Sequence, residues 1–218
     1  MKKIIAISTF FIFSITSAIG ATLTPTFGIS GNMAAYSASG IEREFDGGSQ
    51  VASNRETGAF ATEYASVFVE VGLSENFSIG VDYVPTSFDT PENISNEDQT
   101  NQNRVSARFE DLTTLYAKVN VPQLGGTYLK LGFSTVDVLS KESMNSGSTY
   151  GNDTSSGMTV GLGYDHEIAN GFSIRAEITA SEFDDVTAKS NAATASRTQI
   201  DISDMIGARG TISIAKSF

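Results

Sequence analysis

Several residue types are absent or scarce in this chain of 218 residues. It has no cysteine and no tryptophan, one histidine and 4 prolines. The lack of cysteine excludes disulfides, thiolate metal sites and a cysteine nucleophile. Basic residues are also few, because 14 Lys and Arg stand against 25 Asp and Glu, for a formal net charge of −11. This balance argues against nucleic acid as a partner, since phosphate binding requires clustered Lys and Arg.

Long apolar runs are missing after the first twenty residues, which argues against a helical membrane domain. Residues 1–20, MKKIIAISTFFIFSITSAIG, carry Lys2 and Lys3 ahead of a short apolar stretch. Ala18 and Gly20 stand at the −3 and −1 positions of a predicted cut before Ala21, as in secretory signal peptides. We therefore expect a cleaved signal peptide over residues 1–20 and one domain over residues 21–218.

The chain is instead rich in alternation with period two, which is typical of strands whose faces meet different surroundings. Eight such segments occur, around 26–35, 65–73, 77–83, 115–121, 129–134, 158–165, 172–179 and 202–218. Short turns are predicted at 74–76, 122–126 and 169–171, and long polar connections at roughly 40–60, 85–108, 137–156 and 183–199. We expect the long connections to be mobile loops. Because short and long connections alternate, all long loops share one end.

Eight alternating strands fit a closed up-and-down barrel, either soluble with an apolar interior or transmembrane with an apolar exterior. The polar face favours the second form, because it is rich in Gly, Ser and Thr, which suit a crowded interior. It also carries four acids and four bases in an otherwise acidic chain. These residues are Glu70, Asp82, Asp165, Glu177, Lys118, Lys130, Arg175 and Arg209. Since buried charges must be paired, they predict an ion-pair network in the lumen.

Counting residues outward from the short turns predicts part of this network. Asp165 falls opposite Arg175, and Lys118 falls opposite Lys130. Asp82 is expected beside Lys118 on the next strand. The last strand is expected to place Ile202 on the same apolar face as Ile206 and Ile214.

Aromatic residues mark the short-turn end of the apolar face. They are Phe27, Phe77, Phe172 and Phe218. A ring of aromatic side chains is typical of the membrane interface of a transmembrane barrel. We therefore predict a periplasmic-side aromatic girdle.

The last nine residues, GTISIAKSF, resemble the C-terminal assembly signal of bacterial outer-membrane proteins. Phe218 is preceded by Ile214, Ile212 and Gly210 at alternate positions. The segments LSENFSIGVDYVP and EIANGFSIRAEIT resemble the short-turn hairpins of the small outer-membrane β-barrel family. That family includes opacity-type surface proteins and the membrane domain of OmpA.

This resemblance implies an all-β fold and a location in the bacterial outer membrane. The expected fold is an eight-stranded antiparallel up-and-down transmembrane β-barrel with three short periplasmic turns and four long extracellular loops. The implied partners are outer-membrane lipid and the outer-membrane assembly machinery. We expect a monomer, and the external partner of the loops is left open.

Residues for catalysis or metal binding are sparse. His166 is expected on the apolar face beside Tyr164, whereas Glu167 points the other way, so no triad converges. Asp153 and the second long loop lack the spacing of an EF-hand. We therefore expect no catalytic residue, no metal site and no cofactor.

The leading interpretation is a non-enzymatic integral outer-membrane protein that anchors acidic surface-exposed loops, for envelope structure or surface interaction. Its lumen is expected to be plugged by the charge network. The main alternative is a small passive diffusion pore of the porin type. A soluble periplasmic barrel that binds an apolar ligand and a lipid-modifying outer-membrane enzyme are the remaining alternatives.

Overall fold

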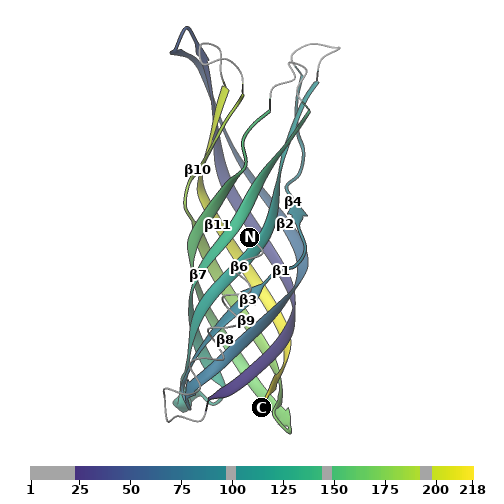
Figure 1. Cartoon of the computed structure of the whole chain (residues 1–218), viewed down its shortest axis with the longest axis vertical. Helices are drawn as coiled ribbons and strands as arrows, with labels where there is room; N and C mark the ends of the chain where they lie inside the picture. The colour runs from purple at the N-terminus through teal and green to yellow at the C-terminus, as the bar shows by residue number, and fades with distance from the viewer. Residues whose placement is uncertain (1–22, 97–101, 144–148, 192–197) are drawn as a thin grey trace.

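A computed structural model describes residues 23–96, 102–143, 149–191 and 198–218, which form a single antiparallel sheet closed into an elongated barrel (Figure 1). The strands are β1 (Thr24–Asp46), β2 (Ser49–Ser74), β3 (Phe77–Tyr83), β4 (Phe88–Asp89), β5 (Asn93–Asn96), β6 (Gln102–Asn120), β7 (Thr127–Ser143), β8 (Asp153–Ala169), β9 (Phe172–Phe183), β10 (Val186–Lys189) and β11 (Thr198–Ser217). One 3-10 turn, η1 (Pro122–Leu124), lies between β6 and β7. Residues 1–20, the predicted signal peptide, lie outside the described residues.

The barrel closes because β1 pairs with β2 along one edge and with β11 along the other. The segments β3, β4 and β5 all pair with β6, and β9 and β10 both pair with β11, so the wall consists of eight strands. The predicted fold is thus confirmed. Closure matters because every backbone group must be paired where no water is available. No helix in the described residues is long and apolar enough to cross a membrane.

The two faces of each strand differ as the alternation predicts, with the polar face inside. On β2, Ser66 and Phe68 are 1% and 5% exposed, whereas Val67 between them is 45% exposed. Apolar side chains face outward on the other strands as well, including Ile29, Leu131, Val160 and Ile212. This arrangement is the reverse of a soluble barrel and is that of a transmembrane barrel.

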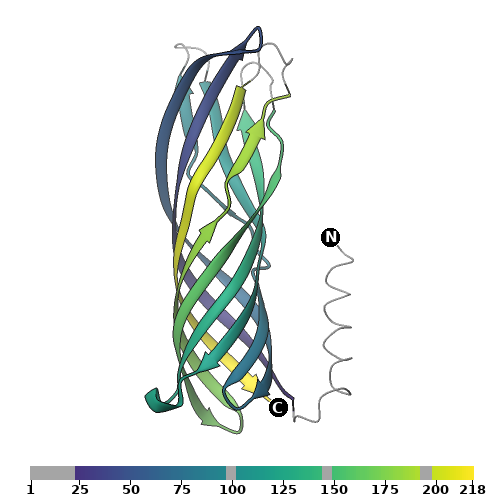
Figure 2. The same ribbon diagram turned by 90° about the vertical axis from the view of Figure 1, so that its left-hand side faces the viewer.

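The short turns and the C-terminus lie at one end of the barrel, which we call the turn side. The β1–β2 hairpin, in dark blue, reaches the opposite end, the loop side (Figure 2). The turn between β8 and β9 is formed by Asn170 and Gly171, with φ values of 53° and 77°. Two successive positive φ values match the twist of a tight hairpin, which favours Asn-Gly at this position.

The prediction of a mobile loop at residues 40–60 is wrong. β1 and β2 instead stay paired up to Asp46 and Ser49, and only Gly47 and Gly48 turn the chain. Residues 49–59 of this hairpin are exposed on both faces, so the sequence shows no apolar alternation there although the backbone is paired. Part of each other long connection is also strand, since β6 begins at Gln102 and β7 ends at Ser143.

Two bulges shift the facing of the strands on the loop side. Asp111 in β6 and Asp204 in β11 have φ values of 53° and 54°, and each sits in an irregularity of the pairing. One extra residue beside Asp204 changes which side chains face inward. Ile202, opposite Gly40 of β1, is therefore partly buried at an interior cavity, whereas Ile206 is 55% exposed, although the alternation had predicted one outer face for both.

Candidate functional site

The eight predicted charged residues come together inside the turn-side half of the barrel, projecting from seven different strands. Glu70 lies at the centre of one group. Its Oε1 is 2.6 Å from Lys118 Nζ, and its Oε2 is 3.0 Å from Arg175 Nη1. Arg175 Nε is also 2.7 Å from Asp165 Oδ2, which lies 3.9 Å from Lys118 Nζ.

The second group is arranged around Glu177. Lys130 Nζ lies 3.0 Å from Glu177 Oε1, and Arg209 Nη2 lies 3.9 Å from the same oxygen. Arg209 Nη1 is also 3.3 Å from Asp82 Oδ1. The two groups together include four acids and four bases, so their formal charges cancel.

Strand register accounts for two of the predicted neighbours and corrects the third. Asp165 pairs with Arg175 across β8 and β9, and Lys118 pairs with Lys130 across β6 and β7. Both hairpins have short turns, which fix the register. Asp82 was expected beside Lys118, but it pairs with Thr114, while Lys118 pairs with Ser78. A long connection joins β3 to β6, so no short turn sets their register.

Interior aromatic residues complete the network, and these were not predicted. Tyr116 and Tyr128 donate hydrogen bonds to Glu70 and Glu177, at 3.1 and 3.0 Å. Lys130 Nζ also lies 4.1 Å from the centre of the Tyr116 ring. Their position on the polar face of alternating strands was a signal in the sequence that could have identified them.

Four interior aromatic residues, including Tyr116 and Tyr128, each lie over a glycine of the neighbouring strand. The register pairs are Phe68 with Gly28, Tyr116 with Gly80, Tyr128 with Gly163 and Tyr36 with Gly207. A Cβ added at Gly163 would lie 2.2 Å from Tyr128 Cζ. The glycines therefore provide the space in which the rings lie flat against the wall.

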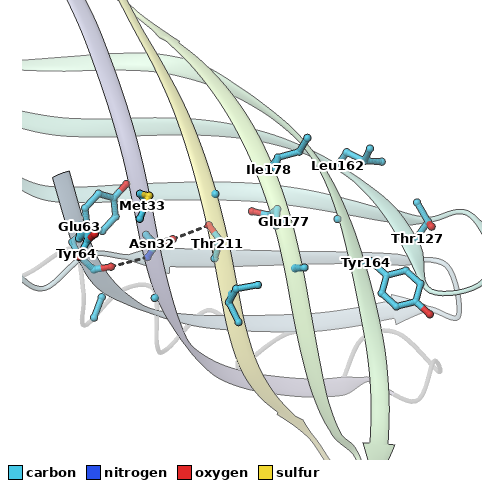
Figure 3. A pocket seen from close by; sticks show the side chains of 16 residues that line it. Asn32, Met33, Glu63, Tyr64, Thr127, Leu162, Tyr164, Glu177, Ile178 and Thr211 are labelled. Carbon is cyan, nitrogen blue, oxygen red and sulfur yellow. Dashed lines mark hydrogen bonds between the residues drawn. The ribbon is translucent and has the colours of Figure 1, made fainter. Parts of the chain in front are cut away.

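A hydroxyl layer lies next to the charged groups. Thr114, Ser134, Thr159 and Ser181 form a chain of 2.8 Å hydrogen bonds across β6, β7, β8 and β9. On the other side of the barrel, Thr211 donates a 2.8 Å bond to Asn32, which in turn donates to the backbone oxygen of Tyr64 (Figure 3). These bonds satisfy polar groups buried on the inner face.

Little space remains in this part of the interior. The cavity between the charged side chains has a volume of about 20 Å³, and the one beside the hydroxyl chain about 10 Å³. A single water molecule needs roughly 10–15 Å³ of such volume. These two cavities thus have room for only one or two water molecules.

The loop-side interior is different, because apolar side chains line it and a larger cavity lies between them. The volume is about 480 Å³. Five aromatic residues, which we call the aromatic cluster, pack together at or beside it: Tyr36, Phe60, Tyr64, Phe88 and Phe109. Leu112, Val136 and Val138 are buried beside the cluster.

The predicted girdle residues lie at the turn side and face outward. Phe27, Phe77, Phe172 and Phe218 are all exposed, and the rings of Phe27 and Phe218 meet edge to face at 6.0 Å. The predicted assembly-signal residues Gly210, Ile212 and Ile214 also face outward along β11. His166 stacks on Tyr164 at the outer surface, away from the charged interior.

Metal-ligating side chains do not cluster in the described part of the chain, where no group of three or more His, Cys, Asp or Glu could hold an ion. Several carboxylates on the loop side are paired with bases, among them Asp89, Glu92 and Asp201. Hydrogen bonds from Arg108 and Lys141 hold the pKa of Asp89 well below its usual range. This ion pair joins β4 to β6 and β7.

Comparison with known proteins agrees with this architecture. The family model described as "Outer membrane protein beta-barrel domain" matches residues 6–202. OprG from Pseudomonas aeruginosa is 14% identical, with a TM-score of 0.54 over 92% of this chain and 99% of that chain. Ail from Yersinia pestis is 10% identical, with a TM-score of 0.44 over 86% of this chain and 99% of that chain. No curated protein sequence matches the chain.

The family match spans most of the chain, and OprG shares the fold at low sequence identity. The apolar exterior and the closed ring of eight strands are what such a family requires. The chain therefore belongs to the outer membrane protein beta-barrel domain family, and it is a protein of the bacterial outer membrane.

Proposed function

We propose that this is a non-enzymatic outer-membrane protein whose lumen is plugged by the charge network and whose work is done by its acidic extracellular half. The barrel then serves as an anchor for that half, in envelope structure or in contact with other surfaces. In this proposal the protein is a monomer in outer-membrane lipid, with the aromatic girdle at the periplasmic interface. The assembly machinery would insert it by recognising the alternating residues that end at Phe218.

One observation supports the proposal: the cavities between the charged groups and beside the hydroxyl chain have volumes of only about 20 and 10 Å³, which is room for one or two water molecules. A passing ion would have to break contacts such as Lys118–Glu70, at 2.6 Å, between buried side chains. Separating a buried ion pair is costly, because each charge loses its partner away from water. The outward position of His166 also supports a role without catalysis.

Conductance across a planar bilayer tests this proposal. We expect refolded protein without residues 1–20 to insert without stable conductance steps, and Glu70→Ala to produce intermittent steps by loosening the plug. A matched variant, Glu63→Ala, changes an exposed carboxylate on the same strand and should stay silent. Steady open steps from the unaltered protein would overturn the proposal in favour of a small passive diffusion pore.

A further inference from the structure

The loop-side cavity has the size of a ligand site. Its volume of about 480 Å³ falls within the roughly 300–1,000 Å³ that small-molecule pockets occupy. It lies inside the barrel, beyond the plugged level of the lumen. The bulges at Asp111 and Asp204 place apolar residues such as Phe109 and Ile202 on its wall.

The floor of the cavity favours a flat, apolar molecule. Among the lining residues, Phe88 stacks on Tyr36 at 5.7 Å and 12° and on Phe109 at 5.3 Å and 23°. Flat ring faces prefer to stack against another planar ring. Fused or linked aromatic rings therefore match this surface better than a branched aliphatic chain.

The charged side chains in the described lining of the cavity are acidic. Glu56 and Glu92 are the charged residues of its described lining, which contains no basic side chain. Glu92 already binds Arg104 at 2.9 Å, and Glu56 has interactions of its own. The polar end of a ligand would therefore meet carboxylates and aromatic faces, and both attract a cation.

Further carboxylates lie directly above the cavity. Glu42 pairs with Ile200 and Glu142 with Val105, and both of these partners line the cavity. The same carboxylates act on Tyr150: burial raises its pKa, and the nearby charges of Glu42 and Glu142 raise it further. The neighbouring bases Arg43, Arg104 and Lys141 are paired with Asp201, Glu92 and Asp89. Glu42, Glu56 and Glu142 therefore leave an excess of negative charge that disfavours an anionic ligand.

The barrel wall beside the cavity is discontinuous. In the part of the chain that the structure describes, β2 pairs on the β3 side only as far as Val67, and β4 pairs with β6 alone. Pro85 and Pro91 flank β4, and proline has no N–H to offer a neighbouring strand. Gly58 on β2 and Thr90 beyond β4 both line the cavity, so backbone pairing does not close the wall beside it.

We infer that this cavity is a binding site for small amphipathic amines that have a planar aromatic body, and that it discriminates against the corresponding acids. The ring system would lie on the aromatic cluster, and the ammonium group would lie toward Glu56 and the carboxylates above. The site deepens the proposed role of the extracellular half. It does not require a plugged lumen, so binding and conductance test the two proposals separately.

The test compares three probes with the same two-ring body: 2-naphthylmethylamine, 2-methylnaphthalene and 2-naphthoate. Binding to the protein in nanodiscs is measured by equilibrium dialysis at pH 7, with empty nanodiscs subtracted. We expect the amine to bind about tenfold more tightly than the acid, the hydrocarbon being intermediate. Equal affinity for amine and acid, or no binding above empty nanodiscs, would overturn the inference.

Two variants with matched controls locate the site. Gly58→Trp should abolish binding by filling the cavity, because a Cβ there meets nothing within 4 Å. Gly31→Trp introduces the same side chain on the membrane face, where there is equal space, and should leave binding unchanged. Glu56→Gln should reduce the preference for the amine, whereas Glu63→Gln should not. Binding that survives Gly58→Trp would place the probes elsewhere and would refute the site.

Discussion

The turn-side half of the barrel interior is charged and filled, whereas the loop-side half is apolar and hollow. In the first, the carboxylate of Glu70 forms ion pairs with Lys118 and Arg175 at 2.6 and 3.0 Å. In the second, Phe88 and its neighbours stack around a cavity of about 480 Å³. The difference follows from what surrounds each half. Where the outer face of the barrel meets lipid, polar side chains must face the interior. Where the outer face meets water, apolar side chains can face the interior instead.

The largest expected effect concerns the charged half. Glu70→Ala leaves Lys118 and Arg175 buried without their shared carboxylate, which should lower the free energy of unfolding by about 3–5 kcal/mol. Urea titration in lipid vesicles, followed by circular dichroism, measures this loss. Glu63→Ala on the outer face of β2 is the control and should not destabilise the barrel. Equal stability of the two variants would show that the network contributes specificity but little stability.

A smaller effect is expected where a ring lies against a glycine. Gly163→Ala places a methyl group 2.2 Å from Tyr128 Cζ and should displace a ring that is 2% exposed and bonded to Glu177. Overpacking of this kind costs about 1–3 kcal/mol. Gly210→Ala, on the outer face with nothing within 4 Å, should change the unfolding free energy by less than about 0.5 kcal/mol. The same urea titration compares them, and an unaffected Gly163→Ala would mean that Tyr128 is free to move.

The smallest expected effect is a local one in the hollow half. The lowered pKa of Asp89 means that its bonds to Arg108 and Lys141 stabilise β4 fully above the unfolded pKa of about 4. This contribution should fade as the pH falls below that value, and it should be modest because the pair is exposed. Hydrogen exchange at the Thr90 N–H, which donates to the backbone oxygen of Ala107, measures this local stability after correction for intrinsic exchange rates. The Asp89→Asn variant should lose this pH dependence, and a dependence that persists would assign it to another group.

Much of the charged half could be predicted from the sequence, because it obeys strict alternation between short turns. Asp165 and Arg175 flank a turn of two residues, so counting outward was enough to pair them. The partner of Asp82 could not be found this way, since a long connection precedes β6. Tyr116 was missed for another reason: its place on the polar face was visible, but its role depends on Gly80 across the strand pair.

Little of the loop-side half could be predicted from the sequence. Its strands meet water outside, so the paired backbone of the β1–β2 hairpin carries no apolar alternation. The facing of Ile202 depends on one residue of β11 in the left-handed region, Asp204. Aspartate tolerates that conformation but does not require it, so the residue type at this position did not predict a bulge. Because the cavity depends on both features, it was not predicted.

The bulge at Asp204 also indicates what the insertion or deletion of one residue would do in this protein. Ile206 and Ile202 lie an even number of positions apart, yet Ile206 is 55% exposed and Ile202 is partly buried beside the cavity. A single codon gained or lost at this level would exchange the outward and inward residues of everything beyond it. The sequence of the strand would still show a regular alternation of apolar and polar residues. A lineage of such barrels could therefore acquire or lose a cavity by one insertion, with almost no change in composition.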